Sequence, residues 1–158
     1  MLTISAAQIE ALGEIERIRF VESMCLHLRQ FFPESVPFLD DQAVRCRVEY
    51  TLRRAAVFGL SSRQDLCRYL NLAALFGWDF DRNPHRAWMH CYLTDDQVSC
   101  PSERLARLVK ECAFRSKIRE KNRALRKEFG QDEDPLCDSM SEFDPHAPLT
   151  LLDKESDR

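Results

Sequence analysis

The chain has 158 residues, of which 44% are hydrophobic and 31% charged, and its formal net charge is −3. This length predicts one domain with at most a short appendage. Four glycines and seven prolines are too few for a many-stranded β-sandwich or a fully disordered chain. The sequence has no run of 18 apolar residues, which excludes a membrane-spanning helix, and four glutamates among the first 25 residues argue against a signal peptide. Composition therefore predicts a soluble, helical, cytoplasmic protein.

The first two predicted elements are helices. Apolar residues that recur every three or four positions predict a helix over about Ala6–Phe31, which Pro33 ends. A second helix is expected over about Gln42–Phe58, capped by Asp40 or Asp41. The apolar face of the first helix is wide enough to contact more than one neighbour.

Glycines mark the helix ends. Gly59, Gly77 and Gly130 each follow an apolar or aromatic residue that closes a helical pattern. That is the position where a left-handed glycine ends a helix. We therefore expect a third helix between Gly59 and Gly77, capped by Ser61 or Ser62.

A loop, a short helix and a long helix follow. The segment 78–84 alternates aromatics with carboxylates, and we expect Asp81 to cap a short helix that Pro84 opens. A fifth helix is expected over about Pro101–Phe129, with Ser99 as its cap. Its 29 residues would span about 43 Å, whereas a compact domain of this size has a radius of gyration of about 15 Å. The last helix must therefore bend, break or project.

The near-neutral net charge conceals two oppositely charged segments. Residues 103–128 hold ten cations and four acids, whereas residues 129–158 hold nine acids and two cations. We predict an all-α bundle of about five helices in residues 1–112, an extension of the last helix over 113–130, and an acidic, largely disordered, flexible tail over 131–158.

The extension of the last helix is the candidate partner-binding segment. Its apolar residues form a stripe too narrow for a core face and suited to a single partner. Arginines flank this stripe and would set orientation and association rate. The candidate residues are Phe114, Arg115, Ile118, Arg119, Arg123, Leu125, Arg126 and Phe129.

Four interpretations of the basic helix remain open, and the sequence ranks them. The first is a solvated helix whose charge its own acidic tail balances, and the second is docking to an acidic protein surface. A nucleic-acid patch ranks third, because no recognition motif accompanies the cations. Membrane-surface binding ranks last, because polar and apolar sides are poorly separated. The sequence specifies no oligomeric state.

No catalytic or metal-binding motif is present. The chain lacks G-x-S-x-G, Walker, G-x-G-x-x-G and H-E-x-x-H patterns. Asp79 and Asp81 could form an acid–base pair or bind a cation, but a cap for the next helix is the favoured interpretation. The seven cysteines are odd in number and include no C-x₂₋₄-C pair, so we expect reduced thiols. We expect no enzymatic activity, metal ion or cofactor.

Three motifs in chain order resemble a known family. They are "FFP" at 31–33, "FGLSSRQDLCRYL" at 58–70, and "FGWDFD…P…W" at 76–88. Together they resemble small helical proteins and carboxy-terminal extensions encoded beside type VI secretion effectors in proteobacteria. The resemblance covers about residues 3–112. The motifs look structural, and the loop signature comprises Gly77, Asp79, Phe80, Asp81, Pro84 and Trp88.

This resemblance implies a non-enzymatic accessory role in the bacterial cytoplasm. The partner would be an effector or its adaptor and spike complex, and the protein would serve as an adaptor or co-chaperone for loading. The alternative is an immunity protein that neutralises a cytoplasm-acting effector toxin, and the further alternative is a nucleic-acid-binding helical protein. The run "NPHRAWMHCYL" at 83–93 is longer than the family's usual run up to the tryptophan. The basic helix and acidic tail also depart from the family pattern, which leaves the partner open.

Overall fold

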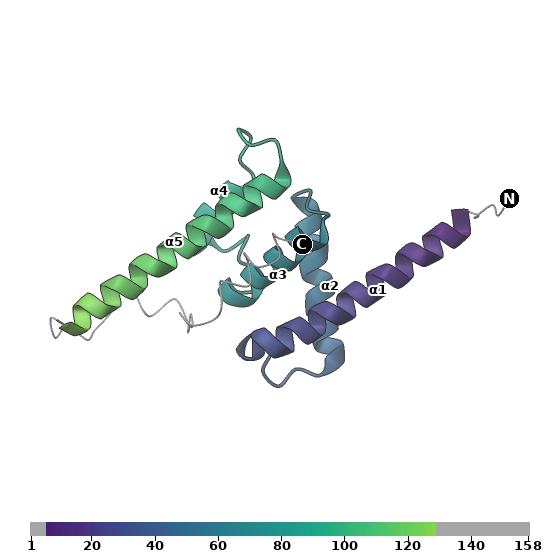
Figure 1. The fold of residues 1–158 in the computed structure, drawn as a ribbon, viewed down its shortest axis with the longest axis horizontal. Helices are drawn as coiled ribbons and strands as arrows, with labels where there is room; N and C mark the ends of the chain where they lie inside the picture. Colours follow the sequence, from purple (N-terminus) through teal and green to yellow (C-terminus); the bar gives the residue numbers. More distant parts are fainter. Residues whose placement is uncertain (1–5, 129–158) are drawn as a thin grey trace.

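The computed structural model describes residues 6–128, with side chains described from residue 13 onward. Predictions that concern Phe129, Gly130 and the acidic tail fall outside these residues. Within them the chain forms five α-helices and two short 3₁₀-helices, and no strand (Figure 1). The all-α prediction is confirmed. The elements are α1 (Ala6–Phe31), η1 (Pro33–Ser35), α2 (Asp41–Val57), α3 (Arg63–Phe76), η2 (Pro84–Arg86), α4 (Ala87–Leu93) and α5 (Pro101–Glu128).

Side-chain caps begin the two central helices. The carboxylate of Asp40 accepts the backbone N–H of Ala43 at 2.7 Å and caps α2. The hydroxyl of Ser62 accepts the backbone N–H of Asp65 at 3.1 Å and caps α3. Each cap satisfies a donor that the first turn of a helix leaves unpaired.

Gly59 ends α2 with a backbone conformation that other residues rarely adopt. Its φ is +77°, and its N–H donates to the carbonyl of Ala56 at 3.0 Å. The N–H of Leu60 donates to the carbonyl of Ala55 at 3.2 Å. This pair of bonds is a Schellman motif. A Cβ at position 59 would also lie 3.1 Å from Cγ of Pro101, so this turn is packed against the start of α5.

Two predicted caps are wrong. Asn83, not Asp81, begins the short helical segment, because its side chain accepts the backbone N–H of His85 at 3.0 Å. Asp81 is instead engaged by an arginine of α2. Cys100, not Ser99, occupies the residue before α5, and its carbonyl accepts the first backbone bond of that helix.

The core consists of two clusters on opposite faces of α3. Leu70 joins one cluster with buried residues of α1 and α2. Leu72 and Tyr69 join the other with buried residues of α4 and α5. Trp78 packs against both clusters. The helix α3 therefore lies at the centre and holds the two long helices on either side of it.

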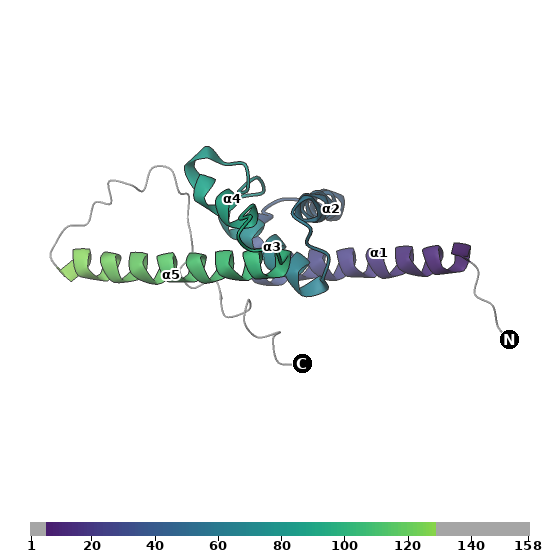
Figure 2. The ribbon, with the colours of Figure 1, turned by 90° about the horizontal axis from the view of Figure 1, so that it is seen from above.

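Both long helices extend away from this centre. Figures 1 and 2 show the N-terminal half of α1 and the C-terminal half of α5 reaching outward in opposite directions. Residues 13–20 of α1 include no buried side chain, and Val21 is the first that is buried. From residue 13 onward, the apolar face of α1 is therefore buried only after position 20. The helix α3 contacts an earlier turn through Arg63, which pairs with Glu16 at 2.6 Å.

Candidate partner-binding surface

The buried residues of α5 all lie in its first three turns. Leu105, Leu108, Val109 and Cys112 are its buried residues, and none of residues 113–128 is buried. The helix nevertheless continues for 28 residues, which is about 42 Å at 1.5 Å per residue. Of the three outcomes that the sequence left open, α5 takes the projecting one.

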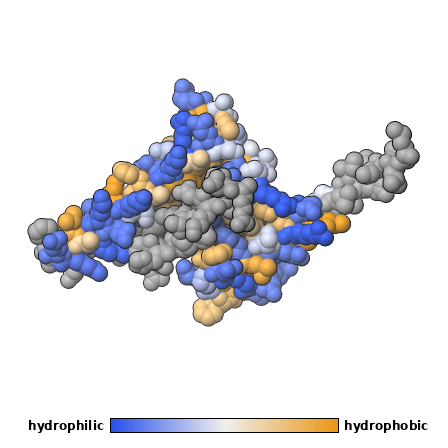
Figure 3. Space-filling model, viewed as in Figure 1, coloured by the Kyte–Doolittle hydropathy of each residue, from blue (hydrophilic) through white to orange (hydrophobic). Residues whose placement is uncertain are grey.

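The apolar stripe of residues 113–128 faces away from the body. Phe114, Ile118 and Leu125 are 59%, 41% and 50% exposed. Phe114 follows the buried Leu105 by nine residues, which turns its side chain about 180° around the helix. In Figure 3 apolar side chains stand among charged ones along this arm. A partner could therefore contact the stripe without displacing any part of the core.

A shallow hollow marks the stripe near the body. Its walls are Phe114, Lys117, Ile118, Glu120, Lys121 and Ala124, which all belong to α5. Two apolar side chains are thus flanked by two lysines and one glutamate. A partner that fits this hollow would place an apolar side chain in it, with carboxylates next to that side chain.

The predicted binding residues divide between two faces of α5. Arg115 does not border the outward stripe, because its Nε donates to Glu111 at 2.7 Å and its guanidinium lies 3.9 Å from the ring centroid of Trp88. Arg119 follows Cys112 by seven residues, or about two turns, so it continues the body-facing side. Arg123 is exposed and Arg126 is partly exposed. Sequence periodicity indicated the stripe but did not separate these two faces.

The loop of residues 77–83, which follows α3, is joined to α2 through its two aspartates. Asp79 accepts the hydroxyl of Tyr50 at 2.5 Å. Asp81 is buried, and its Oδ2 accepts both Nε (at 3.1 Å) and Nη2 of Arg54. The two carboxylates therefore bind different residues of α2 and do not form an acid–base pair with each other.

Further contacts fix the same loop from α3 and α4. Phe80 is buried, with its ring centroid 5.0 Å from that of Tyr69. Burial raises the pKa of the Tyr69 hydroxyl, and the nearby charge of Asp81 raises it further. The Nδ1 of His90 lies 3.0 Å from the carbonyl oxygen of Asp81. The loop thus connects α2, α3 and α4 into one unit that positions the base of α5.

The described residues form neither a metal site nor a membrane span. Among residues 13–128, no three His, Cys, Asp or Glu side chains are grouped to hold a metal ion. None of the helices described is both long and apolar enough to cross a lipid bilayer. No family model, curated protein or solved structure matches the chain.

Proposed function

We propose that the protein is a non-enzymatic accessory factor that binds a type VI secretion effector through α5, as an adaptor or co-chaperone for loading. The observation that carries the binding role is the outward stripe of Phe114, Ile118 and Leu125 on a helix whose opposite face is anchored in the core. A stable apolar row of this kind in contact with water is typical of a docking surface.

The chemistry of the stripe defines the partner surface. Ile118 follows Phe114 by four residues and Leu125 follows Ile118 by seven, and both intervals are among those of a helix that lies in an apolar groove. Residues 113–128 carry seven cations and two acids. We therefore infer an apolar groove with carboxylates at its rim, whose charges speed association and fix the helix orientation.

The motif resemblance of residues 3–112 supports the type VI secretion class. The residues that carry it build the scaffold. Phe32 belongs to one core cluster, Gly59 ends α2, and Phe80 and Asp81 lie buried in the loop. The motifs that resemble the family thus lie in the scaffold, whereas the basic helix departs from the family pattern. This division suits an adaptor whose partner differs from one member to the next.

A matched pair of variants tests the docking surface. The chain is co-expressed with the effector encoded beside it, and the complex is purified and its dissociation constant measured. Ile118→Glu combined with Leu125→Glu should weaken binding at least tenfold, which corresponds to about 1.4 kcal/mol. Val57→Glu, at an apolar residue of α2 that is 68% exposed, is the control and should bind like the original chain. Equal binding by the double variant and the control would reject α5 as the docking surface.

Two further measurements separate the alternative functions. An immunity protein would restore growth to cells that produce a cytoplasm-acting effector, whereas a loading factor would raise secretion of the effector without such protection. A nucleic-acid binder would show an affinity that falls with salt by a log–log slope of about −0.9 per phosphate contact on duplex DNA. Rescue of growth or a steep salt slope, without effector loading, would replace the adaptor proposal.

A further inference from the structure

A second concave surface lies where α5 leaves the body. It is distinct from the outward stripe, because it lies between α5 and the segment that joins α3 to α4. Aromatic rings form part of its wall, and arginines from both sides of the junction face it. The lining residues are Phe76, His85, Arg86, Trp88, Cys112, Arg115, Ser116 and Arg119.

Two arginines of this pocket have no acidic partner among the described residues. Arg86 is partly buried, and its guanidinium lies 5.5 Å from the ring centroid of Phe76. Burial lowers the pKa of Arg86, and the positive charge of Arg119 lowers it further. Within residues 13–128, no carboxylate is in salt-bridge contact with Arg86 or Arg119. Two like charges beside each other in a partly desolvated pocket favour a bound anion.

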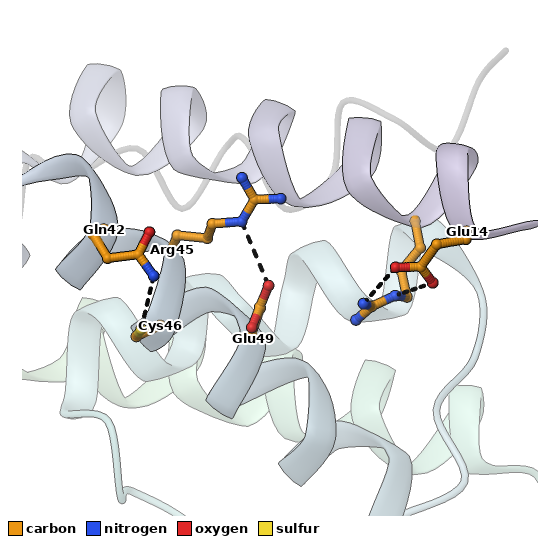
Figure 4. A network of polar contacts seen from close by, with 6 residues as sticks. Glu14, Gln42, Arg45, Cys46 and Glu49 are labelled. Atoms are coloured by element: carbon orange, nitrogen blue, oxygen red, sulfur yellow. Dashed lines mark hydrogen bonds and ion pairs between the residues drawn. The ribbon is translucent and has the colours of Figure 1, made fainter.

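Two ion pairs on the first two helices show the contrast with this pair. Arg17 is paired with Glu14 in α1. Figure 4 shows Arg45 paired with Glu49 in α2. In the pocket itself, Arg115 is already engaged by Glu111. Within this pocket, Arg86 and Arg119 are therefore the described arginines without a carboxylate partner. They lie where α3, η2 and α5 converge.

We propose that the pocket of Arg86 and Arg119 is a carboxylate-binding site, and that the acidic segment 132–138 of the same chain occupies it. Residues 129–138 contain four acids and no lysine or arginine. The charge of this segment therefore complements the pocket. Because it is tethered to α5, its effective concentration exceeds that of a free acidic ligand.

The length of the chain beyond α5 permits this contact. Arg119 precedes Glu128 by nine residues, which is about 14 Å of helix. Residues 132–138 follow Glu128 by four to ten residues, and an extended chain of that length spans about 13–33 Å. An extended chain therefore lets Glu133 and Asp134 return to the level of Arg119, and Asp138 has the length to pass it toward the rest of the pocket.

Occupancy of this pocket would leave the outward stripe accessible. Arg119 follows Phe114 by five residues, which places the two side chains about 140° apart around α5. The bound segment would neutralise the body-facing side of the helix while the apolar anchors remain in water. The proposal therefore extends beyond the adaptor function and does not depend on it.

The test uses the full chain without any partner. Two-dimensional NMR spectra record the side-chain Nε–Hε signals of Arg86 and Arg119 at low salt. In one variant Asp132→Asn, Glu133→Gln and Asp134→Asn are combined. In the matched control Asp153→Asn, Glu155→Gln and Asp157→Asn remove the same charge at the far end of the chain. The first variant should shift both arginine signals, and the control should leave them in place.

Further measurements identify which acidic residues occupy the pocket. The separate variant Arg119→Gln, at an exposed residue, should release the backbone signals of residues 132–138 toward random-coil positions. Unchanged arginine signals in the first variant would overturn the proposal, and so would equal shifts in the control. Shifts that depend on protein concentration would assign the acids to a second copy. Arginine signals that respond only to added effector would assign them to the partner. Either result would overturn the intramolecular occupant while leaving the adaptor function to its own experiment.

Discussion

The ion pair of Arg54 and Asp81 is the contact on which the loop after α3 most depends. Asp81 has almost no exposed surface, and its side chain is 1% accessible against 16% for that of Arg54. Removing one member of such a pair leaves the other charge buried without compensation. The pair therefore contributes to the position of the loop more than its neighbouring surface charges do.

Arg54→Ala should lower the free energy of unfolding by about 3 kcal/mol, because it leaves the carboxylate of Asp81 buried and unpaired. Urea unfolding followed by circular dichroism measures the change. Arg53→Ala, at an exposed residue next to it in α2, is the control and should change stability by about 0.5 kcal/mol or less. Similar losses in both variants would show that the ion pair does not hold the loop.

Phe38 carries the backbone strain of the connection between α1 and α2. It is the only non-glycine residue with positive φ in the described part of the chain, at +57°, and its side chain is fully exposed. A left-handed backbone costs a residue with a Cβ about 1–2 kcal/mol, and asparagine tolerates it better.

Phe38→Asn should therefore raise the free energy of unfolding by about 1 kcal/mol. Thermal and urea unfolding measure this gain. The control Leu26→Asn replaces another exposed apolar residue, which lies within α1, and should lower stability by about 0.5 kcal/mol through helix propensity. A loss in the Phe38 variant would mean that this exposed ring has a contact worth more than the strain.

At the scale of elements, two glycines with different surroundings show how the helices are joined. Gly59 lies in the turn between α2 and α3 with positive φ, and the ring of Pro101 stands next to its Cα. Gly13 lies within α1, and a Cβ there would meet nothing within 4 Å.

Opposite effects of one substitution are expected at these positions. Gly59→Ala should lower the free energy of unfolding by more than about 1 kcal/mol, because the left-handed backbone penalises a Cβ. Gly13→Ala should raise it by up to about 1 kcal/mol, because alanine favours the helix. Chemical unfolding of both variants measures the pair. The absence of a gain at Gly13 would indicate that the N-terminal turns of α1 are not helical in solution.

At the scale of the whole molecule, the buried thiol of Cys112 should make the free energy of unfolding fall at alkaline pH. Burial raises the pKa of the Cys112 thiol to about 12, well above the ordinary value near 8.5. Between these values the unfolded chain releases the proton and the folded chain keeps it. Because the unfolded state then binds fewer protons, the free energy of unfolding falls as pH rises.

The free energy of unfolding should therefore decline between pH 8 and pH 10 more steeply in the original chain than in Cys112→Ala. The expected difference in that decline is roughly 2 kcal/mol. Urea unfolding at each pH measures it. The exposed Cys46 supplies the control, since Cys46→Ala should keep the original slope. Parallel slopes in all three proteins would show that Cys112 does not titrate differently on folding.

The helices could be predicted from the sequence, because their signals are local. Apolar periodicity defined α1 from Ala6 to Phe31, Ser62 was among the expected caps, and Gly59 and Gly77 marked the helix ends. A cap or a left-handed glycine acts within one turn of backbone, so the neighbouring residues suffice to predict it.

Which sides of the helices face each other follows from long-range packing and could not be predicted from local signals. Asp81 pairs with Arg54, 27 residues away, so its spacing suggested a local cap and missed the ion pair. The pocket of Arg86 and Arg119 likewise forms between segments whose approach depends on the packing of α3 against α5. Periodicity gives the angle of a side chain around its own helix, but not the neighbour that it meets. Burial of the core sets that neighbour, and with it the outward direction of the apolar stripe.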